Sequence, residues 1–115
     1  MSMNFIKMLN FYKMFKWEII DLTVQIGLQI KLQRLKKEMS QPQLANEVNL
    51  SKTHVSRIEN GDANVTLTTL INVCNFLDID LSQLFLPIKD AERAILETEI
   101  EILEKEFKNK NKRKS

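Results

Sequence analysis

Apolar residues recur along this chain at the three-and-four spacing of amphipathic helices, and the sequence shows neither strand alternation nor a hairpin signal. Short polar turns divide the pattern into helical segments. These segments cover about residues 4–38, 41–48, 52–60, 67–77, 80–86 and 88–107. The pattern therefore predicts an all-α chain, whose last helix leads into a lysine- and asparagine-rich tail that begins at Lys108.

The first segment carries a heptad seam, because apolar residues alternate three and four positions apart over most of its length. The seam consists of Phe5, Met8, Tyr12, Phe15, Ile19, Leu22 and Ile26. Two interpretations have near-equal support: the seam packs on the chain's own domain, or it forms a dimer contact. Gly27 follows the seam directly and is a position at which the helix could be interrupted or bent.

A second seam lies in the last segment, and acidic and basic residues alternate around it, which makes it a second candidate dimer surface. Its members are Leu96, Ile100, Leu103 and Phe107. The tail from Lys108 to Ser115 is basic, a composition that also occurs in segments that bind nucleic acids. We favour a solvated terminus that frays.

Capping signals mark two short helices in the middle of the chain. Ser40 and Gln43 form a capping-box pattern, and Pro42 lies in the first turn, where the missing N–H is not needed. Asn49 tolerates the left-handed conformation that a tight turn between helices requires. Ser51 is a good cap for the helix that follows.

The 115 residues are sufficient for one compact core, and 43% of them are apolar. The net charge is only +2, and residues 28–86 contain six Lys or Arg and six Asp or Glu. A surface that binds nucleic acid would therefore depend on the placement of a few cations. Charged residues interrupt every apolar run in the first 26 residues, so we expect neither a signal peptide nor a membrane span.

Cys74 is the single cysteine, which excludes an intramolecular disulfide and a zinc cluster within one chain. Its position in an apolar pattern favours a small core residue and a reducing, cytoplasmic location. His54 is the single histidine, and a phosphate contact or a plain exposed position are its two interpretations. Because the sequence has no glycine-rich phosphate loop and no carboxylate pair in a cleft-forming context, and because a lone histidine cannot build a metal site, we expect no cofactor, no metal and no enzymatic activity.

The two capped helices and their turn form a helix-turn-helix pattern over residues 40–61. Apolar residues lie where two crossed helices must touch, at Leu44, Ala45, Val48, Leu50, Val55 and Ile58. The opposite face of the second helix has no acidic residue before Glu59. Its polar residues are Lys52, Thr53, Ser56 and Arg57, with His54 nearby. Such a face predicts contacts with base edges in the major groove of DNA.

With these motifs, residues 27–85 resemble the Cro/C1-type, or xenobiotic-response-element-type, repressor family. The matching stretches are Ile30-Lys31-Leu32-Gln33-Arg34, Ser40-Gln41-Pro42-Gln43-Leu44-Ala45, Val55-Ser56-Arg57-Ile58-Glu59-Asn60-Gly61 and Leu81-Ser82-Gln83-Leu84-Phe85. The resemblance implies a lambda-repressor-like five-helix DNA-binding domain with N- and C-terminal helical extensions. We place the three parts at residues 1–26, 27–86 and 87–115.

The resemblance also implies roles for individual residues. Gln41 corresponds to a glutamine that contacts a phosphate and braces the recognition helix, and Asn60 resembles a contact to the DNA backbone. Arg34 and Glu59 correspond to an internal ion pair, which is architectural. The expected DNA-binding residues are Gln41, Ser51, Lys52, Thr53, His54, Ser56, Arg57 and Asn60.

The chain departs from the family pattern at several positions. Many members have glycine where this chain has Glu38 and Asn49. Asn49 is a tolerable replacement, whereas Glu38 predicts a longer first helix. Leu32 and Leu35 stand where polar residues are common, so we expect the N- or C-terminal extension to cover them.

The leading hypothesis is a sequence-specific regulator of transcription, acting as a repressor, that binds a near-palindromic operator in double-stranded DNA as a homodimer. Dimerisation would place two recognition helices about 34 Å apart, one turn of DNA. The alternatives are an antitoxin that binds a toxin through the extensions, a restriction-modification controller protein, and an interaction module that has lost DNA binding. We expect a cytoplasmic protein of bacterial or phage origin.

Overall fold

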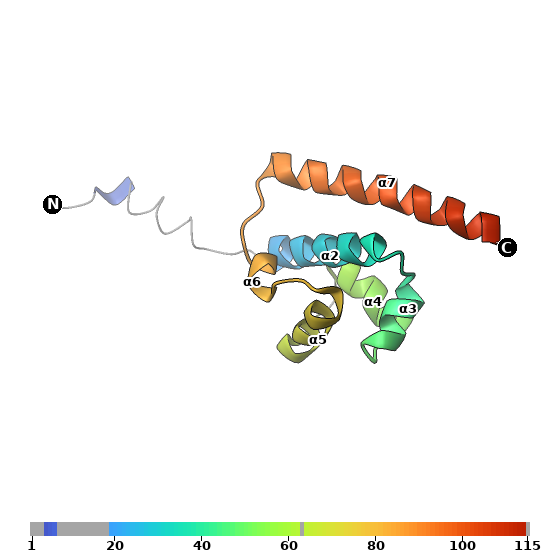
Figure 1. Ribbon diagram of the computed structural model, residues 1–115. Coiled ribbons are helices and arrows are strands. Elements are labelled where there is room, and N and C mark those ends of the chain that lie inside the picture. Colours follow the sequence, from blue (N-terminus) through green and yellow to red (C-terminus); the bar gives the residue numbers. More distant parts are fainter. Residues whose placement is uncertain (1–3, 7–18, 63, 115) are drawn as a thin grey trace.

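The computed structural model describes residues 4–6, 19–62 and 64–114, and this part of the chain contains helices and connecting turns but no strands (Figure 1). The helices are α2 (Ile19–Lys36), α3 (Gln41–Glu47), α4 (Lys52–Glu59), α5 (Leu67–Leu77), α6 (Leu81–Leu84) and α7 (Asp90–Lys114). The prediction of an all-α chain is confirmed. Met8, Tyr12 and Phe15 of the N-terminal seam lie outside the described residues.

Helices α2 to α6 enclose one hydrophobic core. Its buried side chains are Ile26, Ile30, Leu44, Ala45, Val55, Ile58, Leu70, Val73, Cys74, Leu77 and Leu84. Leu22 packs against this core and Ile26 is part of it, so these two members of the N-terminal seam pack on the chain's own domain. Burial, and secondly the nearby Asp80 carboxylate, raise the pKa of the Cys74 thiol. Because Cys74 is buried in this cluster, it is the core residue that its apolar pattern predicts.

Gly27 does not interrupt α2, which is continuous from Ile19 to Lys36. Its role is steric, because a Cβ atom added here would lie 2.5 Å from the carbonyl oxygen of Ile58 and 2.6 Å from that of Glu59. These distances are far below van der Waals contact, and both atoms belong to the backbone of α4. The missing side chain therefore lets the last turn of α4 rest directly on α2.

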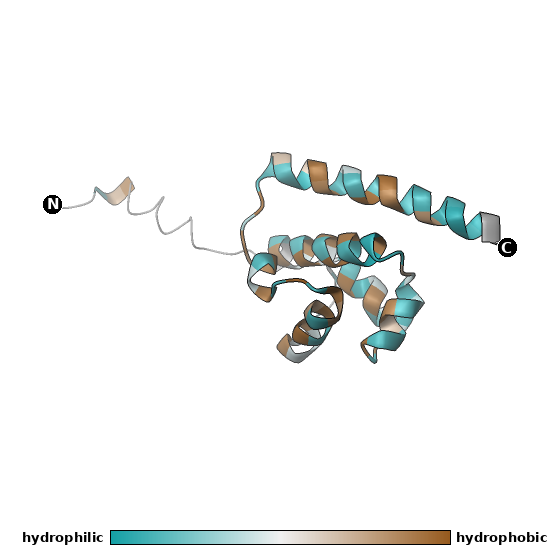
Figure 2. Ribbon diagram, in the orientation of Figure 1, coloured by the Kyte–Doolittle hydropathy of each residue, from teal (hydrophilic) through white to brown (hydrophobic). Residues whose placement is uncertain are grey.

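A second hydrophobic cluster joins α7 to the side of α2 that faces away from the first core (Figure 1). Leu32, Leu35 and Ile100 are its buried members, and Leu28, Leu96, Leu103 and Phe107 pack against them. Figure 2 shows hydrophobic residues recurring along α7 between hydrophilic ones. The expectation that an extension covers Leu32 and Leu35 is confirmed, and the covering extension is the C-terminal one.

The packing of α7 corrects two predictions. The C-terminal seam is not a free dimer surface, because Ile100 and its neighbours are used within the chain. The tail does not fray from Lys108, since α7 continues to Lys114. Phe107 anchors the helix on α2, and one turn later the Lys110 ammonium forms an ion pair with Glu38.

One buried polar side chain ties the segment between α6 and α7 to α2. The Gln25 amide nitrogen donates hydrogen bonds to the carbonyl oxygens of Leu84, at 2.9 Å, and Leu86, while its oxygen accepts the N–H of Ile88 at 3.2 Å. Gln25 is only 3% exposed. Both ends of the amide are thus used to hold the chain where it turns toward α7.

The two turn residues for which the family resemblance leads us to expect glycine, Glu38 and Asn49, both take the left-handed conformation. Asn49 has a φ of 57°, as its side-chain chemistry predicts. Glu38 has a φ of 55°, so the prediction that it lengthens the first helix is wrong. The helix ends at Lys36, and the N–H of Met39 then returns to the carbonyl oxygen of Arg34 at 3.2 Å.

We expect Gly27→Ala to lower the free energy of unfolding by about 1–3 kcal/mol, the usual range for overpacking, because the backbones of α2 and α4 must separate. Urea unfolding followed by circular dichroism measures this change. Lys36→Ala is the control, since Lys36 lies exposed on the same helix and makes a solvent-exposed ion pair with Glu99, which contributes little to stability. An unchanged or higher stability of Gly27→Ala would contradict the close packing of the two helices.

Candidate nucleic-acid interface

Helices α3 and α4 form a compact pair whose ends are defined by side-chain caps. The Ser40 hydroxyl accepts the N–H of Gln43 at 3.1 Å, and the Gln43 side chain accepts the N–H of Ser40 at 2.7 Å. Ser51 caps α4 by accepting the N–H of His54 at 3.0 Å. Between the helices, the N–H of Leu50 returns to the carbonyl oxygen of Ala45 at 2.8 Å. The predicted capping box and cap are confirmed, and they fix where the two helices of the helix-turn-helix begin.

Helix α4 has one buried face and one solvent-facing face. Val55, Ile58 and Glu59 are at most 5% exposed and pack inward. Lys52, Thr53 and Arg57 are exposed on the other side, while the side chains of His54 and Ser56 are partly buried beside them. Ser51 and Asn60 lie exposed at the two ends of the helix. The predicted DNA-binding residues of α4 therefore lie on or next to its accessible surface.

A buried ion pair fixes the inner side of α4. The Arg34 guanidinium donates to both carboxylate oxygens of Glu59, at 2.6 Å from Nε and 2.9 Å from Nη2. Its Nη1 also donates to the carbonyl oxygen of Met39 at 2.7 Å. Both side chains are nearly inaccessible, with 5% of Arg34 and 4% of Glu59 exposed. The predicted internal ion pair is confirmed.

Gln41 joins this network from the first turn of α3. Its amide nitrogen donates to Glu59 Oε1 at 3.0 Å, so Gln41 braces α4 as expected. The same carboxylate thus receives donors from α2 and from α3. The relative orientation of three helices is set at one buried charge, and the contact of Gln41 with a phosphate stays a prediction.

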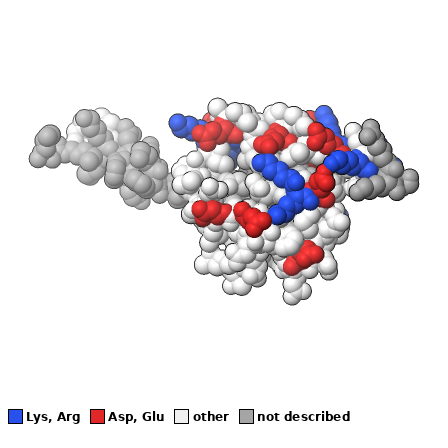
Figure 3. Space-filling view, viewed as in Figure 1, with Lys and Arg blue, Asp and Glu red and all other residues white. Residues whose placement is uncertain are grey.

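The electrostatic character of the surface is mixed. Figure 3 shows acidic and basic side chains interspersed over α2 and α7. On α4, Lys52 and Arg57 have no ion-pair partner among the described residues, so their charges are available to a ligand. The described residues include no group of three or more His, Cys, Asp or Glu side chains that could hold a metal ion. No described helix combines the length and apolar character that a membrane span needs.

Comparison with known proteins agrees with this geometry. A family model described as helix-turn-helix matches residues 30–84, which extend from α2 to the end of α6. The control protein C.MunI from a Mycoplasma species is 37% identical over 70 residues, a match that covers 60% of this chain and 95% of that protein. The chain belongs to the Cro/C1-type helix-turn-helix family. As a member of this family, it is a DNA-binding regulator of transcription.

Solved structures of similar proteins share the same helical arrangement. The restriction-modification controller protein C.AhdI from Aeromonas hydrophila is 33% identical, with a TM-score of 0.53 over 58% of this chain and 96% of that one. A hypothetical transcription factor NHTF from Neisseria is 30% identical, with a TM-score of 0.56 over 70% of this chain and 90% of its own. The residues that the family model matches, 30–84, lie within the five helices α2 to α6.

Two features of this family member could not be foreseen from motifs. Gln25 lies before the family match, and a single glutamine in a helix gives no signal of a buried role. The end of α7 lies beside Ser40, Gln41 and Pro42, at the start of α3. The heptad spacing of α7 was a usable signal for packing, but it does not specify which helix is the partner.

We expect Arg34→Ala to lower the free energy of unfolding by about 3–5 kcal/mol, because the Glu59 carboxylate would stay buried without its partner. Thermal and urea unfolding measure this loss. Arg57→Ala removes the same side chain from the exposed face of α4, and we expect less than about 0.5 kcal/mol of change. Equal effects of the two substitutions would show that the Arg34–Glu59 pair does not organise the motif.

Proposed function

We propose that this regulator binds a near-palindromic operator in double-stranded DNA as a homodimer, and that it represses transcription by occupying that site. The observation that carries the proposal is that α4 has two distinct faces. The inner face is buried and held by the Arg34–Glu59 ion pair, and the outer face is exposed, polar and free of acidic residues. A helix held this rigidly can present its outer side chains to a groove with little loss of entropy.

The polar residues along the accessible side of α4, from Lys52 to Arg57, are suited to reading bases. Lys52 and Arg57 can donate hydrogen bonds to guanine, and the methyl group of Thr53 can contact the methyl group of thymine. Ser56 is a donor and an acceptor for either type of base. Ser51, His54, Gln41 and Asn60 flank this set, and we assign to them contacts with backbone phosphates or sugars.

Exposed apolar side chains suggest where a second copy would bind. Leu67 is 60% and Ile71 is 38% exposed, and they lie four residues apart on one face of α5. Phe85, 36% exposed, and Leu86, 60% exposed, follow α6 directly. The seam of α7 packs on α2, although Ile95 and Ile102 are exposed on the same helix. We place the dimer contact on the exposed apolar residues of α5 and of the segment that follows α6.

The names of two relatives support a role in the control of restriction-modification. C.MunI and C.AhdI are both named as controller proteins, and the second is named as a controller of restriction-modification. Similarity of 37% and 33% over nearly their whole lengths supports the same role for this chain. We therefore favour a restriction-modification controller over an antitoxin that binds a toxin through its extensions.

The experiment is a selection of binding sites from a random duplex DNA pool, followed by affinity measurement on the enriched site. We expect a two-fold symmetric sequence, with two half-sites about one DNA turn apart. Lys52→Ala/Arg57→Ala should abolish the sequence preference while the melting temperature is unchanged, because both side chains are exposed. Lys89→Ala/Arg93→Ala is the matched control, which removes the same charge at the other end of the molecule and should bind as the wild type does.

Light scattering on the same samples tests the dimer. Leu67→Lys/Ile71→Lys should give a folded monomer that binds the symmetric site more weakly. If the wild type is folded and enriches no sequence, the assignment of α4 as a base-reading helix is wrong. If the enriched site lacks symmetry and the bound protein is monomeric, the dimer proposal is wrong and DNA binding stands.

A further inference from the structure

Charge is strongly segregated along α7. Residues 90–104 contain six acidic side chains and one basic one, whereas residues 105–114 contain six basic side chains and one acidic one. The helix dipole favours cations at a C-terminus, but its influence is confined to about the last turn. The basic half of α7 extends over nearly three turns, so the dipole alone does not account for it.

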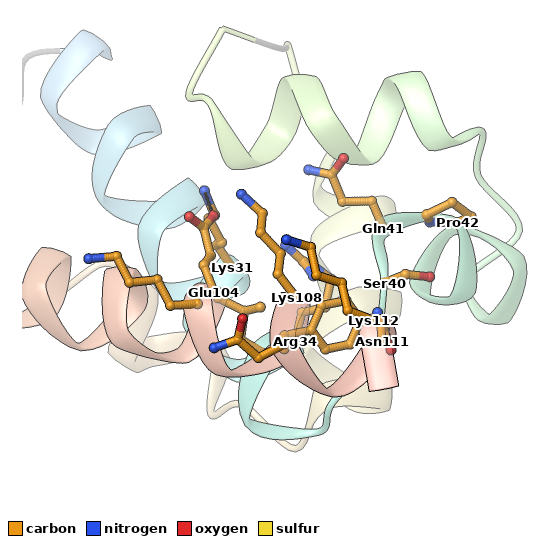
Figure 4. A pocket seen from close by; sticks show the side chains of 13 residues that line it. Lys31, Arg34, Ser40, Gln41, Pro42, Glu104, Lys108, Asn111 and Lys112 are labelled. Atoms are coloured by element: carbon orange, nitrogen blue, oxygen red, sulfur yellow. Dashed lines mark ion pairs between the residues drawn. The ribbon is translucent and has the colours of Figure 1, made fainter. Parts of the chain in front are cut away.

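The basic half of α7 borders an open groove of about 840 Å³ that also touches α2 and the start of α3. Lys31 lines it from α2, Gln41 lines it from α3, and Lys108 and Lys112 line it from α7. Figure 4 shows the three lysine side chains extending toward the same opening, next to the Gln41 side chain. Lysine side chains from two helices thus meet beside the helix-turn-helix, in a groove that Glu104 also lines.

The lysines near this groove differ in how far their charge is already neutralised. Lys31 forms an ion pair with Glu104, and Lys105 lies 3.5 Å from Glu101 in an exposed pair. Lys110 faces the other side, where it pairs with Glu38. Lys108 has no ion-pair partner among the described residues. Lys112 follows it by one helical turn, lines the same groove and takes part in an interaction within the chain.

We propose that the basic end of α7, through Lys108 and Lys112, contacts the phosphate backbone of the same DNA duplex that α4 reads. The proposal rests on the proposed function. Gln41 links the two surfaces, because it lines the groove and also donates a hydrogen bond to Glu59 at the end of α4. A backbone that passes the start of α3 would therefore also pass the groove.

The charge balance of the domain supports this role. Residues 28–86 carry equal numbers of basic and acidic side chains, six of each. Affinity for DNA depends largely on cations that replace condensed counterions on the phosphates. In this chain α7 is neutral as a whole, but its cations are concentrated at the C-terminal end, where residues 105–114 contain six basic side chains and one acidic one. The hydrophobic cluster with α2 holds this helix in place. The groove is open and lysines line its edge. This shape suits a long phosphate backbone that runs past it, whereas a small anion would need an enclosed site.

The test compares Lys108→Gln/Lys112→Gln with the wild type in the full-length chain, since removal of α7 would expose Leu32 and Leu35. The probes are a fluorescent duplex that carries the selected site and a duplex of unrelated sequence, titrated from about 50 to 200 mM salt. We expect affinity for both duplexes to fall by about tenfold at low salt, and the slope of log affinity against log salt to fall by about 1 per lysine. The enriched sequence should stay the same.

Two control variants make the result specific. Lys108→Arg/Lys112→Arg keeps the charge and should bind as the wild type does, and Lys89→Gln/Arg93→Gln removes equal charge from the acidic end and should also bind normally. An unchanged affinity and salt slope in Lys108→Gln/Lys112→Gln would overturn the inference and leave the proposed function intact. A changed sequence preference would also overturn it, because the lysines would then act through α4. A folded wild type that binds neither duplex would overturn the proposed function itself.

Discussion

The buried ion pair between Arg34 and Glu59 is the interaction on which the rest of the structure depends. It joins α2 to α4, and its remaining hydrogen-bonding capacity is used by the Met39 carbonyl and by the Gln41 amide. A buried carboxylate is tolerated only when several donors surround it, so these groups must be in place together. The orientation of α4 relative to α2 and α3 follows from this requirement.

Gly27 also joins the C-terminal end of α4 to α2, but it does so by close packing of the two backbones. The absent side chain allows the carbonyl groups of Ile58 and Glu59 to approach α2, which brings the carboxylate within reach of Arg34. Close packing and charge pairing therefore act together at the C-terminal end of α4. The exposed face of that helix is free of both constraints, and it is there that Lys52, Thr53 and Arg57 are found.

Local signals in the sequence were sufficient for the starts of the short helices, whereas the buried Arg34–Glu59 pair was expected only from the family resemblance. Ser40 with Gln43, and Ser51, set helix starts by chemistry that operates within a few residues. Features that depend on distant partners were harder to foresee. The left-handed Glu38 ends α2 despite a residue type that favours helix, and Gln25 acquires its role only when residues 84–88 pass over it. The seam of α7 was visible, but spacing alone could not distinguish a second chain from α2.

The C-terminal helix α7 adds a basic surface beside the helix-turn-helix. By covering Leu32 and Leu35 it becomes part of the fold, and it brings a basic surface to the start of α3. The family match ends at residue 84, so this arrangement is an addition to the matched domain.

The most direct test of the account is the titration of ¹⁵N-labelled protein with the selected duplex, followed by NMR. We expect the amide signals of Gln41 and of residues 51–60 to change most and those of residues 108–112 to change as well, while the signals of the buried core residues of α5 stay the same. Changes confined to other surfaces, with no change in α4, would contradict the claim that the clamped helix reads the DNA.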